Sequence, residues 1–536
     1  MSSAAATVAP SEGEPVPQSG SHERHLAAGS VAQQVSLVVG SLTMFAVITA
    51  LARTLSLSEF GVYGLMISIP TYLFFAQGSV ETVAVRAIAQ ARNERDRDRA
   101  FTTALSLYAI YGVLATLLIV FAGNALLGVF KIAPSLHDQA RLGLLALGAV
   151  NLLGWPAKTS QDLLRGSGRF VLSAASEALG YLTVTAILLC ALLLSAPLWL
   201  IIGLGGATSL FIGLWAGAAI VFTRQPTRPR TSTLSASYTR SFVSLSFVLL
   251  FSGVSDLLIY SVDRTVLGIF RPTATVGLYE GPVRAHNLVR QLQGALTVIV
   301  MPAAAAYVAA GDRVRLRELL LRGTRYAAIA MMPFTIVFMT LAGPILEVWL
   351  GPRFLPAAGA MTILVSYWLL LGGSSVGLGM MIAAGQLRTV IIYSATVAAL
   401  NLALSLALTP ALGLDGVVLG TSIPYLLMAP VFAYLVCRTF EVPTAAFARE
   451  GFSVAFAAGA LLAAGELLAR IALPITRPAV LLAAIVVGLV GYAAAVYRVG
   501  LRPRERLLVR TTLSGARRRA ISLVRQLAGM RLAGPA

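Results

Sequence analysis

Polar residues recur at helical spacing inside a long apolar segment, residues 276–300. Glu280, Arg284, Asn287 and Gln291 follow one another at intervals of four, three and four residues. At about 100° per residue, these side chains fall on one side of a helix. Arginine offers a fork of donors that suits phosphate. The pattern therefore predicts a polar helix face that presents a cation to an anionic ligand.

Neighbouring apolar segments carry similar stripes. Near segment 242–262, one helix face carries Ser252, Asp256, Tyr260 and Asp263. In and after segment 141–163, another face carries Asn151, Trp155, Lys158, Asp162 and Arg165. In segment 61–84, Gln77 and Glu81 lie one turn apart. Ionisable residues are costly in hydrocarbon and normally face a cavity or a partner. Two interpretations stay open: a water-filled cavity between two halves of the chain, and internal ion pairs, such as Glu280 with Arg284, that lock helices together.

Composition places these stripes in a membrane. The chain has 536 residues, of which 57% are hydrophobic and 12% charged, about half the charged fraction of a soluble domain. About 20 apolar residues cross a bilayer as a helix. We predict an all-α polytopic membrane protein with fourteen spans, at residues 31–52, 61–84, 101–123, 141–163, 171–194, 198–222, 242–262, 276–300, 325–346, 358–382, 389–410, 414–437, 452–473 and 476–497.

Basic residues set the orientation through their bias towards the cytoplasmic side. With both termini inside, 31 of them lie on the cytoplasmic side, and the other side carries Arg53, Lys131, Arg141, Arg264, Arg271, Arg353, Arg470 and Arg477. This bias and a basic tail account for the net charge of +19, so we expect no nucleic-acid partner.

The segments group into two parallel halves. Tyr63 and Tyr279 end similar motifs 216 residues apart, and the links at Gly166 and Gly385 lie 219 residues apart, which suggests an internal duplication. We expect a disordered cytoplasmic tail at 1–28, six-helix halves at 29–222 and 241–438, a cytoplasmic linker at 223–240, two extra helices within 439–498, and a basic amphipathic cytoplasmic tail at 499–536 that binds anionic lipid.

Short loops and missing motifs disfavour enzymatic chemistry. The longest predicted interhelical loop has about 25 residues, too short for the outer catalytic domain that a membrane glycosyltransferase generally needs. The sequence shows no zinc-protease, Walker A or nucleophile-elbow motif in a suitable context, and its two cysteines fall in separate spans. We therefore expect neither a catalytic residue nor a metal or organic cofactor.

Three motifs carry a resemblance to a known family. Residues 53–64 (RTLSLSEFGVYG), residues 263–270 (DRTVLGIF) followed by VGLY at 276–279, and residues 401–416 resemble signatures of the polysaccharide-exporter branch of the multidrug/oligosaccharidyl-lipid/polysaccharide flippase superfamily. The likeness spans about residues 30–440. Lipid II flippases are expected to carry arginines within the first helix; residues 31–50 contain none, which disfavours a lipid II cargo.

This resemblance implies a transporter of the bacterial cytoplasmic membrane that flips a polyprenyl-diphosphate-linked oligosaccharide by alternating access. In that reading a binding surface comprises Arg284, Arg290, Asn287, Gln291, Lys158 and Arg165, while Asp256, Asp263, Glu280 or Asp162 couples transport to protons or sodium ions. The polysaccharide synthesis machinery is the implied partner, and a monomer suffices because both halves belong to one chain.

Three alternatives remain. A cation-coupled drug exporter of the same superfamily would give drug resistance and no polymer defect. A membrane glycosyltransferase would transfer sugar when purified. A structural partner of a synthase complex would tolerate substitution of every stripe residue.

The orientation predicts which loops are reachable from outside. In a chain with Cys190 and Cys437 replaced by Ser, Ser135→Cys should react with an impermeant maleimide on intact spheroplasts, and Ser232→Cys only after permeabilisation, because the two positions lie on opposite sides. Equal labelling of both before permeabilisation would overturn the predicted topology.

Overall fold

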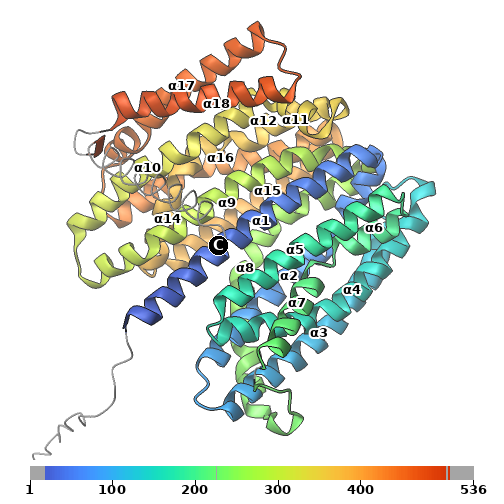
Figure 1. Ribbon diagram of the computed structural model, residues 1–536. Helices are drawn as coiled ribbons and strands as arrows, with labels where there is room; N and C mark the ends of the chain where they lie inside the picture. The colour runs from blue at the N-terminus through green and yellow to red at the C-terminus, as the bar shows by residue number, and fades with distance from the viewer. Residues whose placement is uncertain (1–18, 225, 502–504, 507–536) are drawn as a thin grey trace, which may run out of the picture. The chain divides into compact units, whose positions relative to one another are not determined.

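A computed structural model describes the backbone at residues 19–224, 226–501 and 505–506; side chains at 19–27, 74–76, 248–261 and 499 are outside the description. All regular elements of this part are helical (Figure 1). Contacts divide the chain into unit 1, up to Leu257, and unit 2, from Leu258 onward.

Unit 1 is a bundle of long helices. α3 packs along α4, α1 along α5, and α7 against α4. Its elements are α1 Ser19–Thr54, α2 Leu57–Ala89, α3 Glu94–Leu127, α4 Pro134–Gly166, α5 Phe170–Leu193, α6 Leu198–Gly205, α7 Thr208–Phe222, the 3₁₀ turn η1 Thr231–Thr233 and the first part of α8, Ala236–Phe270.

Unit 2 contains the rest of α8 and the later helices. α15 packs along α16, α10 along α17 and α9 along α14. The elements are α9 Thr273–Ala309, α10 Arg313–Thr340, α11 Ala342–Leu350, η2 Pro352–Ala357, α12 Ala358–Ser366, α13 Trp368–Leu371, η3 Gly372–Ser374, α14 Ser375–Ala383, α15 Leu387–Leu412, α16 Leu414–Thr439, α17 Thr444–Ala472, α18 Pro478–Ala495 and the π-helical turn η4 Val496–Gly500.

The all-α membrane fold is confirmed, whereas the count of fourteen spans stays a prediction. Among the described residues, ten helices are long and apolar enough to cross a membrane, or thirteen if each of three bent pairs is one span. Segment 242–262 falls in α8, where the side chains of 248–261 are not described. The predicted span 325–346 bends by 76° after α10.

The predicted disordered tail is shorter than expected. Residues 19–28 form the first turns of α1, because they continue directly into a long helix and extending that helix needs no new nucleus. Residues 1–18 lie outside the described residues, and so does most of the basic tail after residue 501. The predicted contact of the basic tail with anionic lipid therefore stays a prediction.

The motif at residues 53–64 has a structural explanation at the start of α2. The Ser56 side chain accepts a hydrogen bond from the Glu59 backbone at 3.2 Å, and the Glu59 carboxylate accepts one from the Ser56 backbone at 2.8 Å. This reciprocal pair, a capping box, satisfies two N–H groups that the first helical turn leaves without partners. The motif therefore fixes where α2 begins.

The links after α4 and α14 share one backbone geometry. Gly168 and Gly385 have φ of 73° and 72°, and in both links the glycine N–H and the N–H after it bond back to the preceding helix in a Schellman motif. Aligning these glycines gives an offset of 217 residues (385 minus 168). The offset of 219 inferred from the sequence was wrong by two residues, because the positive φ belongs to the second glycine of the GSG link.

Unit 1 depends on close helix approach at Gly213. A Cβ built there lies 2.4 Å from the Ala157 carbonyl carbon of α4, whereas one at Gly217, a turn later on α7, meets only Ser160 Oγ at 3.6 Å. Small residues let membrane helices approach in this way.

We expect Gly213→Ala to lower the free energy of unfolding by about 1–3 kcal/mol, because the α4–α7 backbones must separate. Gly217→Ala is the matched control and should melt like the original protein. Thermal unfolding in detergent measures both, and equal melting of the two variants would contradict the packing argument.

Candidate functional site

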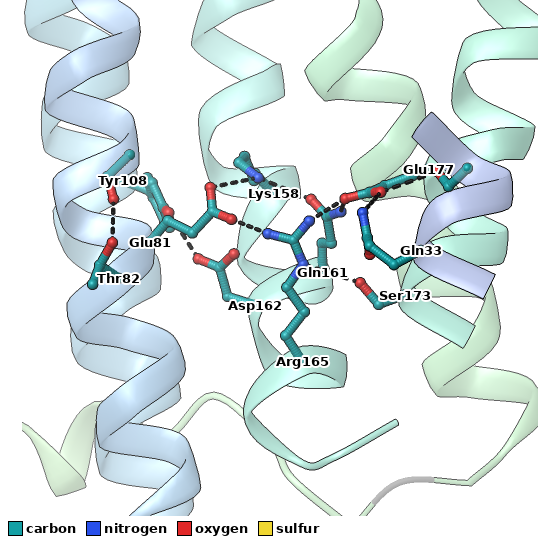
Figure 2. Close-up of polar contacts among 12 residues, drawn as sticks. Gln33, Glu81, Thr82, Tyr108, Lys158, Gln161, Asp162, Arg165, Ser173 and Glu177 are labelled. Atoms are coloured by element: carbon teal, nitrogen blue, oxygen red, sulfur yellow. Dashed lines mark hydrogen bonds and ion pairs between the residues drawn. The ribbon is translucent and has the colours of Figure 1, made fainter. Parts of the chain in front are cut away.

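Unit 1 contains a buried network of charges, the α4 cluster, formed by Glu81, Lys158, Gln161, Asp162, Arg165 and Glu177. Lys158 Nζ lies 2.9 Å from Glu81 Oε2. Arg165 pairs through one terminal nitrogen with Glu81 and through the other with Glu177 (Figure 2). One guanidinium therefore bridges carboxylates from two helices, α2 and α5.

Glu177 gathers further donors around its carboxylate. Gln161 Nε2 donates to Oε1 at 2.5 Å, while Gln33 Nε2 and Ser36 Oγ of α1 donate to Oε2 at 2.9 and 3.1 Å (Figure 2). Its side chain is only 8% exposed. A buried carboxylate needs such donors to offset its lost hydration. This single residue consequently joins α1, α4 and α5.

Asp162 is fully buried beside this network. Tyr108 of α3 donates its hydroxyl to Asp162 Oδ2 at 2.7 Å, and Oδ1 has no hydrogen-bond partner among the described atoms. The carboxyl group therefore has one oxygen whose hydrogen-bonding capacity is unused among the described atoms. Asn151 and Trp155, which the sequence placed on the same stripe, instead bond within α4 and to each other.

A cavity of about 470 Å³ opens against the α4 cluster. Its polar lining includes Gln77, Glu81, Lys158, Arg165, Glu177 and Tyr181. Gly205, Gly206, Thr208 and Ser209 line it where α6 and α7 meet at a 52° bend. Broken helices are tolerated at membrane depth where they line a cavity. The sequence predicted an unbroken span here.

Unit 2 places two arginines on one carboxylate. Glu280, 1% exposed, accepts from Arg264 Nε at 2.5 Å and from Arg284 Nη2 at 3.1 Å. The sequence placed Arg264 on the side opposite the cytoplasm, just after the predicted span 242–262. In the structure α8 continues to Phe270, so Arg264 lies within the helix and its side chain is only 13% exposed.

Asp263 belongs to a separate buried network. Tyr279 donates to Asp263 Oδ2 at 2.7 Å and Thr421 Oγ1 lies 3.0 Å from the same oxygen, while Asn401 Nδ2 donates to Thr421 Oγ1 at 2.8 Å. The motifs at 263–270, 276–279 and 401–416 therefore meet in space and connect α8, α9, α15 and α16.

The other candidates on α9 have mixed environments. Arg290 and Asn287 are partly buried and Gln291 is exposed, so the predicted stripe runs from a buried to an exposed end. His286 contacts the Tyr367 hydroxyl and is 3% exposed, as expected for a packed residue. The side chain of Asp256 lies outside the described residues.

The α4 cluster and α9 differ in their balance of charges. In the α4 cluster two basic side chains face three carboxyl groups, and both are already engaged by Glu81 and Glu177. α9 carries Arg284 and Arg290 against Glu280 alone. Anion binding therefore fits α9 better than α4. Within the described residues, no group of three or more His, Cys, Asp or Glu could hold a metal ion.

Sequence reasoning missed Glu177, Gln161 and Gln33. Glu177 had a detectable signal, since it is the only charged residue of the predicted span 171–194. Gln161 lies next to a predicted stripe residue, but nothing in the sequence indicates that it faces Glu177. Gln33 could be found only from the packing of α1 on α5.

Comparisons with known proteins place the chain in a family. Residues 50–359 match the model of a family described as polysaccharide biosynthesis protein. The chain belongs to this family. It is 23% identical over 410 residues to an uncharacterized membrane protein, EpsK, of Bacillus subtilis (strain 168), a match that covers 72% of this chain and 77% of EpsK.

Solved structures show the same fold. The lipid II flippase MurJ, in an inward closed conformation, aligns with a TM-score of 0.68 at 15% identity, over 87% of this chain and 97% of MurJ. An inward-facing multidrug resistance MATE family transporter of the MOP superfamily aligns with a TM-score of 0.65 at 15% identity, over 76% and 98% of the two chains. The predicted resemblance to a polysaccharide family is confirmed by the family match, and these structures confirm the fold.

The α4 cluster predicts a large cost for losing Glu177. Glu177→Ala should lower the free energy of unfolding by about 3–5 kcal/mol, because a buried guanidinium loses one of its carboxylates. Glu441→Ala is the control: Glu441 also pairs with two arginines, Arg313 and Arg317, but is 51% exposed, so the expected loss is below about 1 kcal/mol. Thermal unfolding in detergent compares them, and similar losses would contradict a stabilising role for the cluster.

Proposed function

We propose that the protein flips a polyprenyl-diphosphate-linked oligosaccharide, the repeat unit of a surface polysaccharide, across the bacterial cytoplasmic membrane. The match of residues 50–359 to the polysaccharide biosynthesis family is the observation that carries this proposal. The fold shared with MurJ and the MATE transporter supports transport rather than catalysis.

The charges of unit 2 support an anionic head on the cargo. Arg284 donates to Glu280 through one terminal nitrogen, its side chain is 18% exposed, and its buried Nε has no hydrogen-bond partner among the described atoms, so Glu280 does not engage all of its donors. Guanidinium groups bind diphosphate oxygens through paired donors. In this proposal Arg284 and Arg290 meet the diphosphate, while Asn287 and Gln291 bond to sugar hydroxyls along the exposed end of the stripe.

The transport cycle in this proposal involves both halves of the chain and a coupling ion. Alternating access of the two halves moves the cargo, and both termini lie in the cytoplasm. Protons or sodium ions drive the cycle through a buried carboxyl group, of which Asp162, Asp263 and Glu280 are the described candidates. Lys158 and Arg165 contact cargo only after Glu81 or Glu177 releases them.

The protein acts as a monomer, with the polysaccharide synthesis machinery as its partner. The segment 31–50 has no arginine, which favours a cargo other than lipid II.

Arg284 provides the test. In a deletion strain complemented with Arg284→Ala, we expect lipid-linked repeat units to accumulate at least tenfold, because the diphosphate loses its paired donors. Mass spectrometry of lipid extracts measures the accumulation, and immunoblots of membranes verify insertion. Arg313→Ala, an exposed arginine in an ion pair, is the control and should export normally.

Two outcomes would contradict the proposal. Full export by Arg284→Ala removes that residue from the mechanism. Polymer production in the deletion strain without any build-up, even after other flippases of this superfamily are deleted, excludes the assigned cargo.

A further inference from the structure

The segment between α7 and α8, predicted as a linker between the halves, is fastened to α3 within unit 1. Residues 227–233, which we call the strap, bond to the beginning of α3 and end in the 3₁₀ turn η1, which packs on the same helix. Only Leu234 and Ser235 separate this turn from the start of α8. Two side chains of α3, Asp98 and Thr102, provide the attachment.

Asp98 is the charged anchor of the strap. Its side chain is only 3% exposed; Oδ1 accepts from the Arg228 backbone N–H at 3.0 Å, and Oδ2 pairs with Arg230 Nε at 3.4 Å. A buried carboxylate needs such donors to offset its lost hydration, and hydrogen bonds to an ionised group are stronger than neutral ones. Both oxygens of Asp98 are therefore engaged by the strap.

Thr102, one turn later on α3, holds the next backbone donor. Its hydroxyl accepts from the Arg230 N–H at 2.9 Å and donates to the Asp98 carbonyl at 2.6 Å. Pro229, between the two donors, has no N–H to satisfy and a fixed φ. Thr233 then bonds to the Arg230 carbonyl through its N–H at 3.0 Å and its hydroxyl at 2.6 Å. The attachment thus depends on the spacing of residues along the strap.

The beginning of α8 packs on the same part of unit 1. Phe242, 4% exposed, belongs to an apolar cluster with side chains of α2, α3 and α4. The Arg99 guanidinium of α3 lies over the Tyr238 ring, 5.8 Å from its centroid. α8 then continues beyond Leu257, where unit 1 ends. Because the strap ends two residues before α8, it limits how far the first turn of α8 can leave α3.

This attachment bears on movement of the halves, since α8 carries the chain from one unit into the other. Rigid-body motion of a half requires its elements to move as one piece. We propose that Asp98 is a positioning residue of the transport cycle: by fastening the strap to α3, it keeps the beginning of α8 fixed on unit 1. The role in transport rests on the proposed function, whereas the attachment of the strap does not.

Limited trypsin digestion of the purified full-length protein in detergent tests the attachment. Cleavage after Arg230 should be at least tenfold faster in Asp98→Asn, because the new amide sets a donor against the Arg230 guanidinium and the strap opens more often. Glu94→Gln makes the same charge change at an exposed position in the first turn of α3, so it should be cleaved like the original protein. Mass spectrometry identifies the cut, and thermal unfolding verifies that each variant is folded.

Two insertions test positioning in cells. A short Gly-Ser insert after Pro229 breaks the spacing between the Arg228 and Arg230 donors, whereas the same insert after Arg224 precedes the strap and leaves it intact. In a deletion strain, Asp98→Asn and the insert after Pro229 should each raise lipid-linked repeat units at least fivefold. Glu94→Gln and the insert after Arg224 should export like the original protein.

Each contrast has an outcome that overturns the proposal. Equal cleavage of Asp98→Asn and Glu94→Gln would show that Asp98 does not hold the strap. Normal export by Asp98→Asn, or equal export by the two insertion variants, would remove the positioning role, because a free linker tolerates either insert. If Asp98→Asn fails to fold, the two insertion variants decide both cleavage and export. Failure of the proposed function is distinguishable, since the original chain would then restore no export while cleavage still differs.

Discussion

A charged side chain within an apolar span must find its compensation inside the protein, and this constraint organises both units. The hydration that a surface carboxylate receives is missing there, so donors from neighbouring helices replace it. Arg165 and Glu177 show the consequence. Their network draws donors or acceptors from α1, α2, α4 and α5, so each of these helices must hold its rotation and depth for the charges to be satisfied.

Hydrogen bonds extend the same constraint to neutral partners. Tyr108 on Asp162 and Tyr279 on Asp263 are buried pairs of the same chemistry, one in each unit. A phenol hydroxyl can donate to a carboxylate without adding charge. The Tyr279 pair also recruits Thr421 and, through it, Asn401, so residues far apart in the chain are held at one point. Motifs that look like turn signals in the sequence thus include buried acceptors that fix helix contacts.

Much of this organisation was accessible from sequence because hydropathy and helical periodicity are local properties. The all-α membrane fold, the stripe on α9 and the shared helix face of Lys158, Asp162 and Arg165 follow from composition and a period of 3.6 residues. The contact of that face with Glu81 does not, because it joins two helices. The bend between α6 and α7, the inward position of Arg264 and the donors around Glu177 depend on which helices touch. Such contacts are set by packing at positions like Gly213, where the partner backbone and not the local sequence decides the approach.

The arrangement around Glu280 bears on how a transporter can both bind and release an anion. Arg264 and Arg284 are held by a carboxylate that is itself buried, so neither guanidinium has to pay its full desolvation cost when no ligand is present. In the proposed function, the diphosphate of the cargo competes with Glu280 for the donors of Arg284, and the carboxylate repels it. Affinity is therefore lower than two free arginines would give. Transport requires binding strong enough for entry and weak enough for exit, and an internal carboxylate that takes the guanidinium back as the anion leaves meets both requirements.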